Sequence, residues 1–281
     1  MRKAPLMRRR HTLAAIVAAT GLLLGLAGCG GSDDDASSSS SDTLKVGVSP
    51  VPHGEILKYV ADNLAAKEGL KLDIVEFNDY IQPNVALQEK QLDANYFQHI
   101  PYLEEEVASK GYKFTPLKPV HIEPLGVYSK KVKSLAEVPD GGTVAVPNDP
   151  SNSGRALNLL AKNGLITLKE GVGVKATEKD ITGNPKNLKF SALEAAQLPR
   201  SLDDTALSVI NGNYAIETGL SPAKDALALE EGKDNPYANL VVVRTGDESD
   251  PRITKLETLL HSPEVKKFIE DKYQGSVLAA F

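Results

Sequence analysis

The sequence predicts an α/β protein with two lobes, preceded by a segment that is not part of the fold. Apolar residues alternate as in strands and then recur at helical spacing, in an exchange that starts at Leu44. A second exchange of this kind begins near residue 125 and continues toward the end of the chain. The first 28 residues, in contrast, combine basic and apolar stretches as secretory signal peptides do.

The N-terminal segment ends in a cysteine preceded by small residues. Five basic residues come first: Arg2, Lys3, Arg8, Arg9 and Arg10. An apolar run over 12–27 follows, which is too short to span a bilayer comfortably. The run closes with Leu26-Ala27-Gly28-Cys29, which resembles a bacterial lipobox. We therefore expect 1–28 to be a lipoprotein signal peptide and Cys29, the only cysteine, to carry the lipid. An ordinary signal peptide with an incidental cysteine is the alternative.

Residues 29–42 are expected to form a flexible tether. After Cys29 they consist of Gly, Ser and Asp with one Ala, which cannot bury enough apolar surface to fold. Cleavage before Cys29 would remove five basic residues and no acidic one, taking the formal charge from -5 to -10. Such an acidic protein is a poor partner for nucleic acid. A single anchoring cysteine also leaves no disulfide to stabilise the fold.

The first part of the folded region alternates strands and helices. Strands are expected at 44–48, 72–75 and 92–94, and helices at 56–68, at 83–91 and from Pro101 onward. Proline followed by glutamates in the next turn suits a helix start and the positive end of the helix dipole. This order of elements implies a mostly parallel sheet with helices on both faces.

A second α/β unit follows in the middle of the chain. Strands are expected at 125–128, 143–146, 188–190 and 240–243, a helix at about 153–162, and a passage from helix to strand within 202–210. Four consecutive apolar residues at 240–243 indicate a strand buried on both faces. The chain ends in an amphipathic helix that has Val265, Phe268 and Ile269 on one face. The simplest arrangement is two lobes whose strand ends face one cleft.

Motifs of enzymes and of helical metal sites are lacking in the sequence. It contains no G-x-S-x-G, no P-loop, no H-E-x-x-H and no pair of cysteines. No two of the five histidines, His11, His53, His99, His121 and His261, are three or four residues apart. Each is expected at the surface or at a helix cap. No catalytic residue, metal or cofactor is therefore predicted.

The loop after the expected strand at 143–146 combines a helix start with a cation. A helix that begins near Ser153 would present free backbone N–H groups and a partial positive charge. Arg155 would then lie in the first turn, where the dipole disfavours a cation. An anionic ligand held between Arg155 and these N–H groups would remove the conflict. A solvated Arg155 paired with Asp149 is the alternative.

Aromatic residues gather in two loops. The segments 77–80 and 95–102 contain five of the fifteen Phe and Tyr residues, namely Phe77, Tyr80, Tyr96, Phe97 and Tyr102. Pocket walls collect aromatic side chains in this way. Packing in the core beneath the loops is the alternative for each of them.

Five motifs resemble those of the NlpA/MetQ-type methionine-binding lipoproteins. In order they are Phe77-Asn78-Asp79-Tyr80, Asp93-Ala94-Asn95-Tyr96-Phe97-Gln98-His99, Val146-Pro147-Asn148-Asp149-Pro150, Gln197-Leu198-Pro199-Arg200-Ser201-Leu202 and Val209-Ile210-Asn211. The resemblance extends from about Leu44 to Phe281. It implies a two-lobed type II periplasmic-binding-protein fold with a ligand cleft between the lobes. Lobe I would comprise 44–125 and 240–281, and lobe II 126–239.

The resemblance also implies a ligand and its site. The protein would capture L-methionine and deliver it to an ABC importer permease, anchored through Cys29 to the outer face of the cytoplasmic membrane. Arg155 matches the residue that binds the ligand carboxylate, and Asn211 and Asn239 match residues that bond the head group. Tyr80, Phe97 and His99 match the wall around the ligand side chain. Glu123 could meet the ammonium, and no role is assigned to Tyr96.

Two other functions remain open. The same fold could bind another ligand, such as a methionine-containing dipeptide. It could also serve a surface or adhesion lipoprotein that takes no part in transport.

Overall fold

The structure, a computed structural model, describes residues 43–233 and 235–281. The signal peptide expected at 1–28, the lipid site at Cys29 and the tether at 29–42 lie outside the described residues. Within the described part, no helix is both long and apolar enough to cross a membrane.

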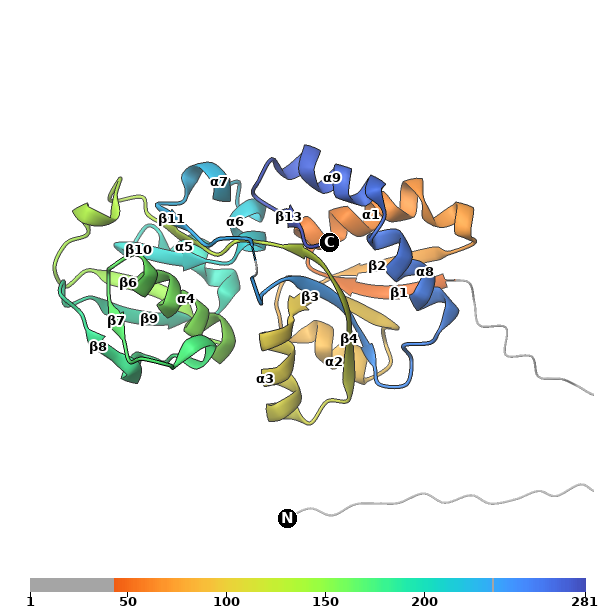
Figure 1. Ribbon diagram of the computed structural model, residues 1–281, viewed down its shortest axis with the longest axis horizontal. Coiled ribbons are helices and arrows are strands. Elements are labelled where there is room, and N and C mark those ends of the chain that lie inside the picture. The colour runs from red at the N-terminus through yellow and green to blue at the C-terminus, as the bar shows by residue number, and fades with distance from the viewer. Residues whose placement is uncertain (1–42, 234) are drawn as a thin grey trace, which may run out of the picture. The chain divides into compact units, whose positions relative to one another are not determined.

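The larger sheet has six strands in the order β13-β4-β12-β3-β1-β2 (Figure 1). The strands are β1 (Thr43–Val48), β2 (Lys71–Glu76), β3 (Ala94–His99), β4 (Phe114–Ile122), β12 (Asn239–Arg244) and β13 (Leu278–Ala279). β1 runs parallel to β2 and β3, whereas β12 runs antiparallel to β3 and β4. The sheet thus combines strands from the first third of the folded chain with strands from its end.

The smaller sheet has five strands in the order β11-β5-β10-β6-β9. They are β5 (Gly126–Tyr128), β6 (Thr143–Pro147), β9 (Lys189–Leu193), β10 (Leu207–Ile210) and β11 (Ala228–Leu229). β6 is parallel to β9 and β10, and β5 is antiparallel to β10 and β11. Both sheets are therefore mixed, whereas mostly parallel ones were expected. Four of the antiparallel pairs involve β5 or β12, the strands that follow the crossings between the sheets, and β13 adds another with β4.

Nine α-helices accompany the sheets in the described region. They are α1 (Glu55–Asn63), α2 (Gln82–Gln88), α3 (Ile100–Lys110), α4 (Pro150–Lys162), α5 (Leu198–Ser201), α6 (Gly212–Glu217), α7 (Pro222–Asp225), α8 (Pro251–Leu260) and α9 (Pro263–Tyr273). A short β-hairpin, β7 (Thr167–Leu168) with β8 (Ile181–Gly183), follows α4.

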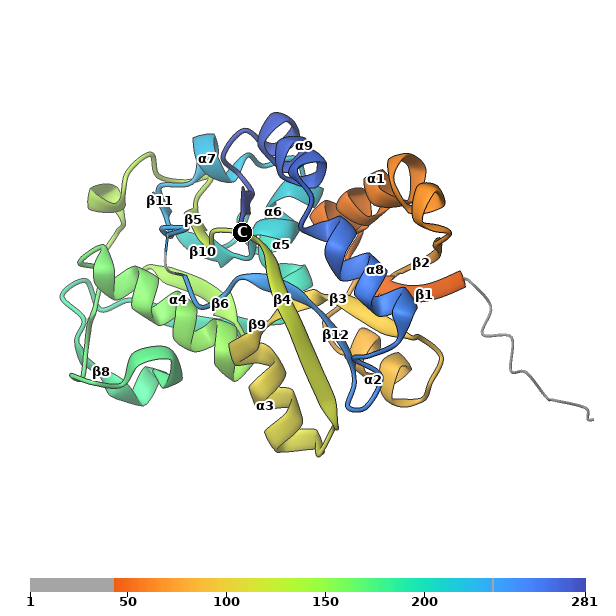
Figure 2. The same ribbon diagram turned by 45° about the vertical axis from the view of Figure 1, so that its right-hand side comes forward.

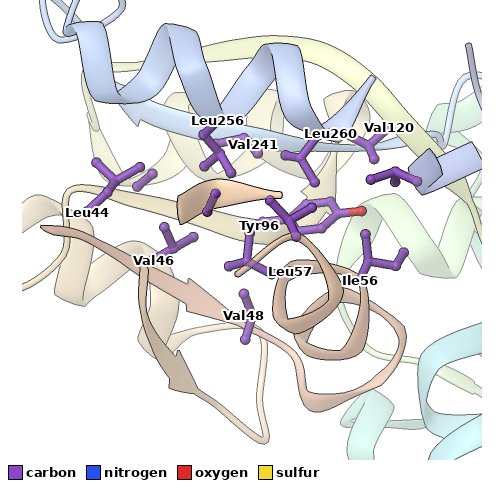
Figure 3. Close-up of a cluster of buried hydrophobic side chains, with 14 of the residues drawn as sticks. Leu44, Val46, Val48, Ile56, Leu57, Tyr96, Val120, Val241, Leu256 and Leu260 are labelled. Atoms are coloured by element: carbon purple, nitrogen blue, oxygen red, sulfur yellow. The ribbon is translucent and has the colours of Figure 1, made fainter. Parts of the chain in front are cut away.

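Each sheet packs on a hydrophobic core of its own. In the larger sheet α1, α8 and α9 cover one face and α2 and α3 the other (Figure 2). Figure 3 shows the first of these layers, where Leu44, Val46 and Val48 of β1 meet Leu57 of α1 and Leu256 of α8. Fully burying such a side chain contributes roughly 1.5–3 kcal/mol. The smaller sheet packs its apolar residues against α4 in a separate cluster.

The strand at 240–243 has the two-sided burial that its apolar run indicates. Val241 and Val243 face the layer of α1 and α8, and Leu240 and Val242 face the layer of α2 and α3. β4, in contrast, was not anticipated. Its prolines have no backbone N–H to donate to a neighbouring strand, so the sequence pattern did not predict a strand there. Pro116 and Pro119 lie where the pairing with β12 shifts register, and β13 pairs only with the end of β4.

Two other element boundaries differ from expectation. The strand expected at 92–94 lies at Ala94–His99, and all six of its residues are buried. The helix expected from Ser153 begins at Pro150, because Asp149 caps it by accepting from the Asn152 N–H at 2.8 Å. An aspartate N-cap followed by proline is enough to start a helix, and here this pair starts α4 three residues before the predicted start at Ser153.

The chain crosses between the sheets twice, and the two crossovers are hydrogen-bonded to each other. The first crossover joins β4 to β5 through 123–125, and the second joins β11 to β12. The Glu230 N–H donates to the Leu125 carbonyl at 2.9 Å, and the Leu125 N–H donates to the Glu230 carboxylate at 3.2 Å. The crossovers therefore form one joint between the two halves of the described region.

Candidate functional site

A narrow cavity lies between the two sheets, close to the crossovers. The larger sheet and its loops contribute Tyr80, Phe97, Gln98, His99, Tyr102, Glu123 and Asn239 to its lining. The smaller sheet contributes Asn152 and Arg155 of α4 and Asn211, Gly212 and Asn213 at the start of α6. All six residues predicted to bind a ligand therefore line one cavity; their contact with a ligand stays a prediction.

One wall of the cavity is aromatic. The ring centroids of Tyr80, Phe97 and Tyr102 lie 5.9 to 6.0 Å from one another. The Tyr102 hydroxyl donates to the Tyr80 carbonyl at 2.9 Å, which ties the loop after β2 to α3. The other two aromatic residues of these loops, Phe77 and Tyr96, pack in the hydrophobic cores instead. The aromatic loops thus supply both a cavity wall and core packing.

Arg155 is buried and paired, with only 4% of its surface exposed. Arg155 was expected in the first turn of the helix. Because α4 begins at Pro150, it lies in the second turn instead. Its Nε donates to the two carboxylate oxygens of Glu230 at 2.9 and 3.1 Å, and its Nη2 bonds the same carboxylate. The alternative of a solvated Arg155 paired with Asp149 is wrong, because the Asp149 carboxylate binds Asn152.

Further contacts of Arg155 leave one nitrogen available. Nη2 also donates to the backbone carbonyl of Glu123 at 3.0 Å. The ring of Tyr237 stacks on the guanidinium, with Cζ 4.3 Å from the ring centroid. Nη1 has no hydrogen-bond partner among the described residues. Since Arg155 lines the cavity, Nη1 is the part of its guanidinium that a ligand could engage.

Asparagines link the two sides of the cavity. The Asn152 Oδ1 accepts from Asn211 Nδ2 at 3.0 Å and from His99 Nε2 at 3.2 Å. The Tyr80 hydroxyl donates to Asn213 Oδ1 at 2.5 Å. Two buried atoms, Asn211 Oδ1 and Asn213 Nδ2, are left without a partner. Buried polar atoms are nearly always bonded, and an unsatisfied one costs about 1–3 kcal/mol. One unpaired acceptor and one unpaired donor therefore belong to residues of the same cavity.

His99 is a neutral member of this network. Its Nδ1 accepts from the Tyr102 N–H at 3.2 Å, which makes it the N-cap of α3, and its Nε2 carries the proton given to Asn152. Burial, followed by the nearby charge of Arg155, lowers the pKa of His99 to about 3. The imidazole therefore contributes a flat, uncharged surface to the cavity.

Glu123 rests on two buried histidines. His121 Nε2 lies 2.6 Å from the Glu123 carboxylate, and His53 Nε2 lies 3.2 Å from it and 3.0 Å from Asn239 Oδ1. His121 Nδ1 bonds the Tyr96 hydroxyl. The expectation of a surface or cap position is therefore wrong for His53 and His121, which are buried. His53 bonds Asn239, 186 residues away, and such a contact leaves no local pattern in the sequence.

The charge of Glu123 is not balanced by these histidines. Burial lowers the pKa of His53 to about 4 and that of His121 to about 3, so both are neutral at pH 7. Burial also raises the pKa of Glu123, and the nearby His53 and Arg155 oppose that rise. Among the described residues, no lysine or arginine side chain forms an ion pair with the Glu123 carboxylate. A cationic group in the cavity would therefore find a carboxylate that is open to pairing.

His53, His121 and Glu123 are also of the types that bind metals, and their ligand atoms lie within 4.8 Å of one another. In the neutral histidines, Nε2 of His121 donates to Glu123 and Nε2 of His53 donates to Asn239 Oδ1, so each of these nitrogens carries a proton and has no lone pair for a metal. The three side chains are explained as a hydrogen-bonded support for the cavity. The expectation that no metal binds stays a prediction.

Sequence reasoning missed Asn152, Asn213 and Glu230 as members or neighbours of the site. Asn211-Gly212-Asn213 directly follows a buried strand, a position where helix starts collect ligand-binding groups, and could have been found. Gly212 is needed there because a Cβ would lie 2.7 Å from the Glu123 Cβ. Glu230 has no local signal, since it lies in a loop 75 residues after Arg155.

Comparison with known proteins agrees with this architecture. The NlpA lipoprotein family matches residues 44–281. The D-methionine-binding lipoprotein MetQ of Salmonella typhimurium is 45% identical over 266 residues, which cover 93% of this chain and 96% of that protein. A nutrient binding protein from Burkholderia cenocepacia, solved bound to methionine, is 50% identical with a TM-score of 0.82 over 85% of this chain and 100% of that one.

A third relative is a periplasmic substrate-binding protein of an ABC transporter from Coxiella burnetii. It is 43% identical with a TM-score of 0.81, over 84% of this chain and 100% of that chain. These matches confirm the predicted two-lobed α/β fold and the resemblance on which it was based. The chain belongs to the NlpA lipoprotein family and is a MetQ-type substrate-binding lipoprotein, not an enzyme.

Proposed function

We propose that the protein binds L-methionine in the cavity between its sheets and delivers it to an ABC importer. One observation carries the proposal: buried polar groups of opposite kinds are left unpaired around a single cavity. Among the described residues, Arg155 Nη1 and Asn213 Nδ2 are donors without partners, and Asn211 Oδ1 is an acceptor without one. Glu123 adds a carboxylate that no lysine or arginine of the described residues pairs with.

These groups match the two ends of an amino-acid head group. The ligand carboxylate would accept from Arg155 Nη1 and Asn213 Nδ2. Its ammonium would donate to Asn211 Oδ1 and to the Glu123 carboxylate, with Asn239 Oδ1 beside them. Because the low dielectric of a buried site strengthens such contacts, the zwitterion would be held firmly.

The aromatic wall supports a methionine side chain. Tyr80, Phe97 and Tyr102 present rings and the neutral His99 presents no charge, so a charged side chain would lose its hydration there without a partner. A flexible thioether gains sulfur–aromatic contacts of roughly 0.3–1.5 kcal/mol each. Relatives are named for D-methionine, and the enantiomers place the side chain differently once the head group is fixed. The ligand test therefore includes both.

Delivery to the importer would take place outside the cytoplasmic membrane. The lipobox sequence ending in Cys29 supports attachment of the protein to the outer face of that membrane. Relatives from Mannheimia haemolytica are named outer membrane lipoproteins, so the test of localisation compares both membranes.

A panel of ligands tests the proposal. Protein unfolded during purification and refolded is titrated by calorimetry with L-methionine, D-methionine, methionine-containing dipeptides, norleucine, leucine, valine and lysine. We expect L-methionine to bind tightly and leucine, valine and lysine at least about ten-fold more weakly; norleucine should bind at a cost of ~1–3 kcal/mol. Binding of a dipeptide but not of free methionine would refute the ligand. Binding of nothing would favour the adhesion lipoprotein.

A further inference from the structure

Arg155 is held by residues of the two crossovers. Glu123 lies in the first crossover and bonds Arg155 Nη2 through its carbonyl. Glu230 lies one residue after β11, at the start of the second crossover, and Tyr237 lies near its end. Together these three contacts enclose the guanidinium on one edge and one face.

We propose that Glu230 is a positioning residue for ligand binding: it fixes Arg155 so that Nη1 points to the ligand carboxylate, and it ties that contact to the joint between the crossovers. The inference rests on the proposed function, because it needs a carboxylate ligand at Arg155. It assigns to Glu230 a role that is distinct from contact with the ligand itself.

The geometry favours positioning over competition. A carboxylate that competed with the ligand would occupy the side of Arg155 that faces the cavity. Glu230 instead takes Nε and Nη2, and it does not belong to the lining of the cavity, whereas Arg155 does. With the second Nη2 proton given to the Glu123 carbonyl, only Nη1 remains. Glu230 thus sets which nitrogen the ligand meets.

Glu230 also connects Arg155 to the joint of the crossovers. The same carboxylate accepts from the Leu125 N–H at 3.2 Å, and the Glu230 N–H donates to the Leu125 carbonyl at 2.9 Å. A guanidinium fixed at this joint would keep its place if the two lobes changed their separation about the crossovers. The ligand carboxylate would therefore meet a preformed cation before the lobes close, which reduces the ordering that binding requires.

Charge supports the same conclusion. Arg155 with 4% exposure would be a costly buried cation without Glu230, and its long side chain would be free to change rotamer. The Arg155–Glu230 pair is locally neutral, so attraction to the ligand depends on the orientation of Nη1 more than on net charge. Loss of the carboxylate should therefore weaken binding, although it makes the site more positive.

The test is the variant Glu230→Gln, which keeps the size and one acceptor but loses the charge and the paired geometry. We expect its Kd for L-methionine, measured by calorimetry, to rise roughly ten-fold or more. If Glu230 competes with the ligand, the Kd falls. The control is Glu231→Gln at the residue next to Glu230. It removes an exposed ion pair with Lys162 and should leave the Kd unchanged.

Two further measurements separate positioning from a structural defect. L-methioninamide lacks the carboxylate, so Glu230→Gln should hardly change its weak binding, and the preference for methionine over the amide should collapse. In an Arg155→Lys background, Glu230→Gln should have little additional effect, because the group it positions is gone. Kd reports only folded protein, and a partly unfolded variant would appear as reduced stoichiometry.

The outcomes distinguish the two proposals. Wild-type protein that does not bind L-methionine would overturn the proposed function. Wild-type binding that Arg155→Lys weakens and Glu230→Gln leaves unchanged would overturn only the role of Glu230. Equal losses for methionine and methioninamide would also overturn it, because the effect would then not pass through the carboxylate.

Discussion

Arg155 illustrates how much of the site depends on single polar atoms. Three of its contacts hold the guanidinium in place, and one nitrogen is left for a ligand. Asn211 and Asn213 follow the same principle, since each has one amide atom bonded and one unpaired. Buried atoms without partners are costly, so a ligand that satisfies them removes a penalty as well as adding contacts.

Replacement of Arg155 by alanine should strongly weaken binding. Loss of one partner from a buried charged contact typically costs about 2–5 kcal/mol, which is roughly 30-fold to several-thousand-fold in Kd. Arg155→Lys should restore only part of it, because an ammonium cannot bond Glu230 and the ligand as the planar guanidinium does. Lys162→Ala, at the exposed end of the same helix, is the control. Calorimetry that shows Arg155→Ala within a few-fold of wild type would contradict the role.

The buried histidines predict that acid destabilises the ligand-free protein. The pKa values of His53 and His121 in the folded state, about 4 and 3, lie below the ordinary 6.5. The unfolded chain therefore binds more protons between these values, and the free energy of unfolding falls as the pH drops from about 6.5 toward 4. Each histidine should account for roughly 2 kcal/mol between pH 7 and 5.

Urea unfolding at pH 7 and pH 5 measures this effect. Glu123 acts in the opposite direction, because burial raises its pKa and its contribution to stability is lost as the pH rises. His121→Gln, which cannot titrate, should reduce the difference between the two pH values, and His261→Gln outside the cluster should not. Equal pH dependence in wild type and His121→Gln would show that the cluster does not control stability.

At the scale of elements, the start of α4 connects helix stability to the site. Asp149 accepts from the Asn152 N–H and from its side-chain amide, and this orients Asn152 toward His99 and Asn211. The N-cap thus has two roles, one in starting the helix and one in ordering the polar side of the cavity. The cap of α9 has only the first role: Ser262 accepts from the Val265 N–H at 3.3 Å and does not line the cavity.

Asp149→Ala should lower both stability and affinity. Loss of an N-cap costs about 0.5–2 kcal/mol of folding free energy. Release of the Asn152 side chain should add a several-fold increase in the Kd for L-methionine. Ser262→Ala is the matched control, since it removes a cap of the same kind far from the cavity and should change only the denaturation midpoint. Unchanged binding by Asp149→Ala would mean that Asn152 keeps its orientation without the cap.

For the whole molecule, hydrogen bonds across the cavity indicate how two lobes would close on a ligand. Tyr80 bonds Asn213 and His99 bonds Asn152, each pair joining the side of the larger sheet to that of the smaller one. The Tyr214 hydroxyl adds a third contact by donating to the Asn78 carbonyl at 3.2 Å. If these contacts opened, the crossovers would still join the two sides, and we therefore expect hinges near 124–126 and 238–240.

Ligand should therefore compact the protein. Small-angle scattering of ligand-free protein is expected to give a larger radius of gyration than the same sample with saturating L-methionine. Asn213→Ala removes one of the contacts across the cavity and should shift the protein toward the larger radius at subsaturating ligand. A radius that L-methionine does not change would indicate a rigid, preformed site.

Attachment to the membrane should depend on Cys29. Cys29→Ala removes the only thiol that can be lipidated, so the protein should appear in the soluble fraction of cells with an unchanged Kd for L-methionine. Fractionation of wild-type cells shows which membrane holds the protein. A Cys29→Ala variant that still partitions into detergent would contradict the lipobox interpretation.

The sequence by itself determined the features that depend on neighbouring residues. Apolar periodicity placed β1, β2, β6 and β12, and four apolar residues in a row indicated the burial of β12 on both faces. The order of short motifs was enough for the family. Local patterns suffice for these features because strand and helix periodicity repeats within a few residues.

Only the tertiary structure decided which polar groups meet. The partner of Arg155 lies 75 residues away, His53 bonds an asparagine 186 residues away, and the prolines of β4 hid a strand that the sheet accepts through register shifts. Hydrogen bonds depend on distances and angles that the sequence does not contain. For the same reason, the unpaired atoms of the cavity, on which the proposed ligand depends, are a property of the three-dimensional arrangement and not of the sequence.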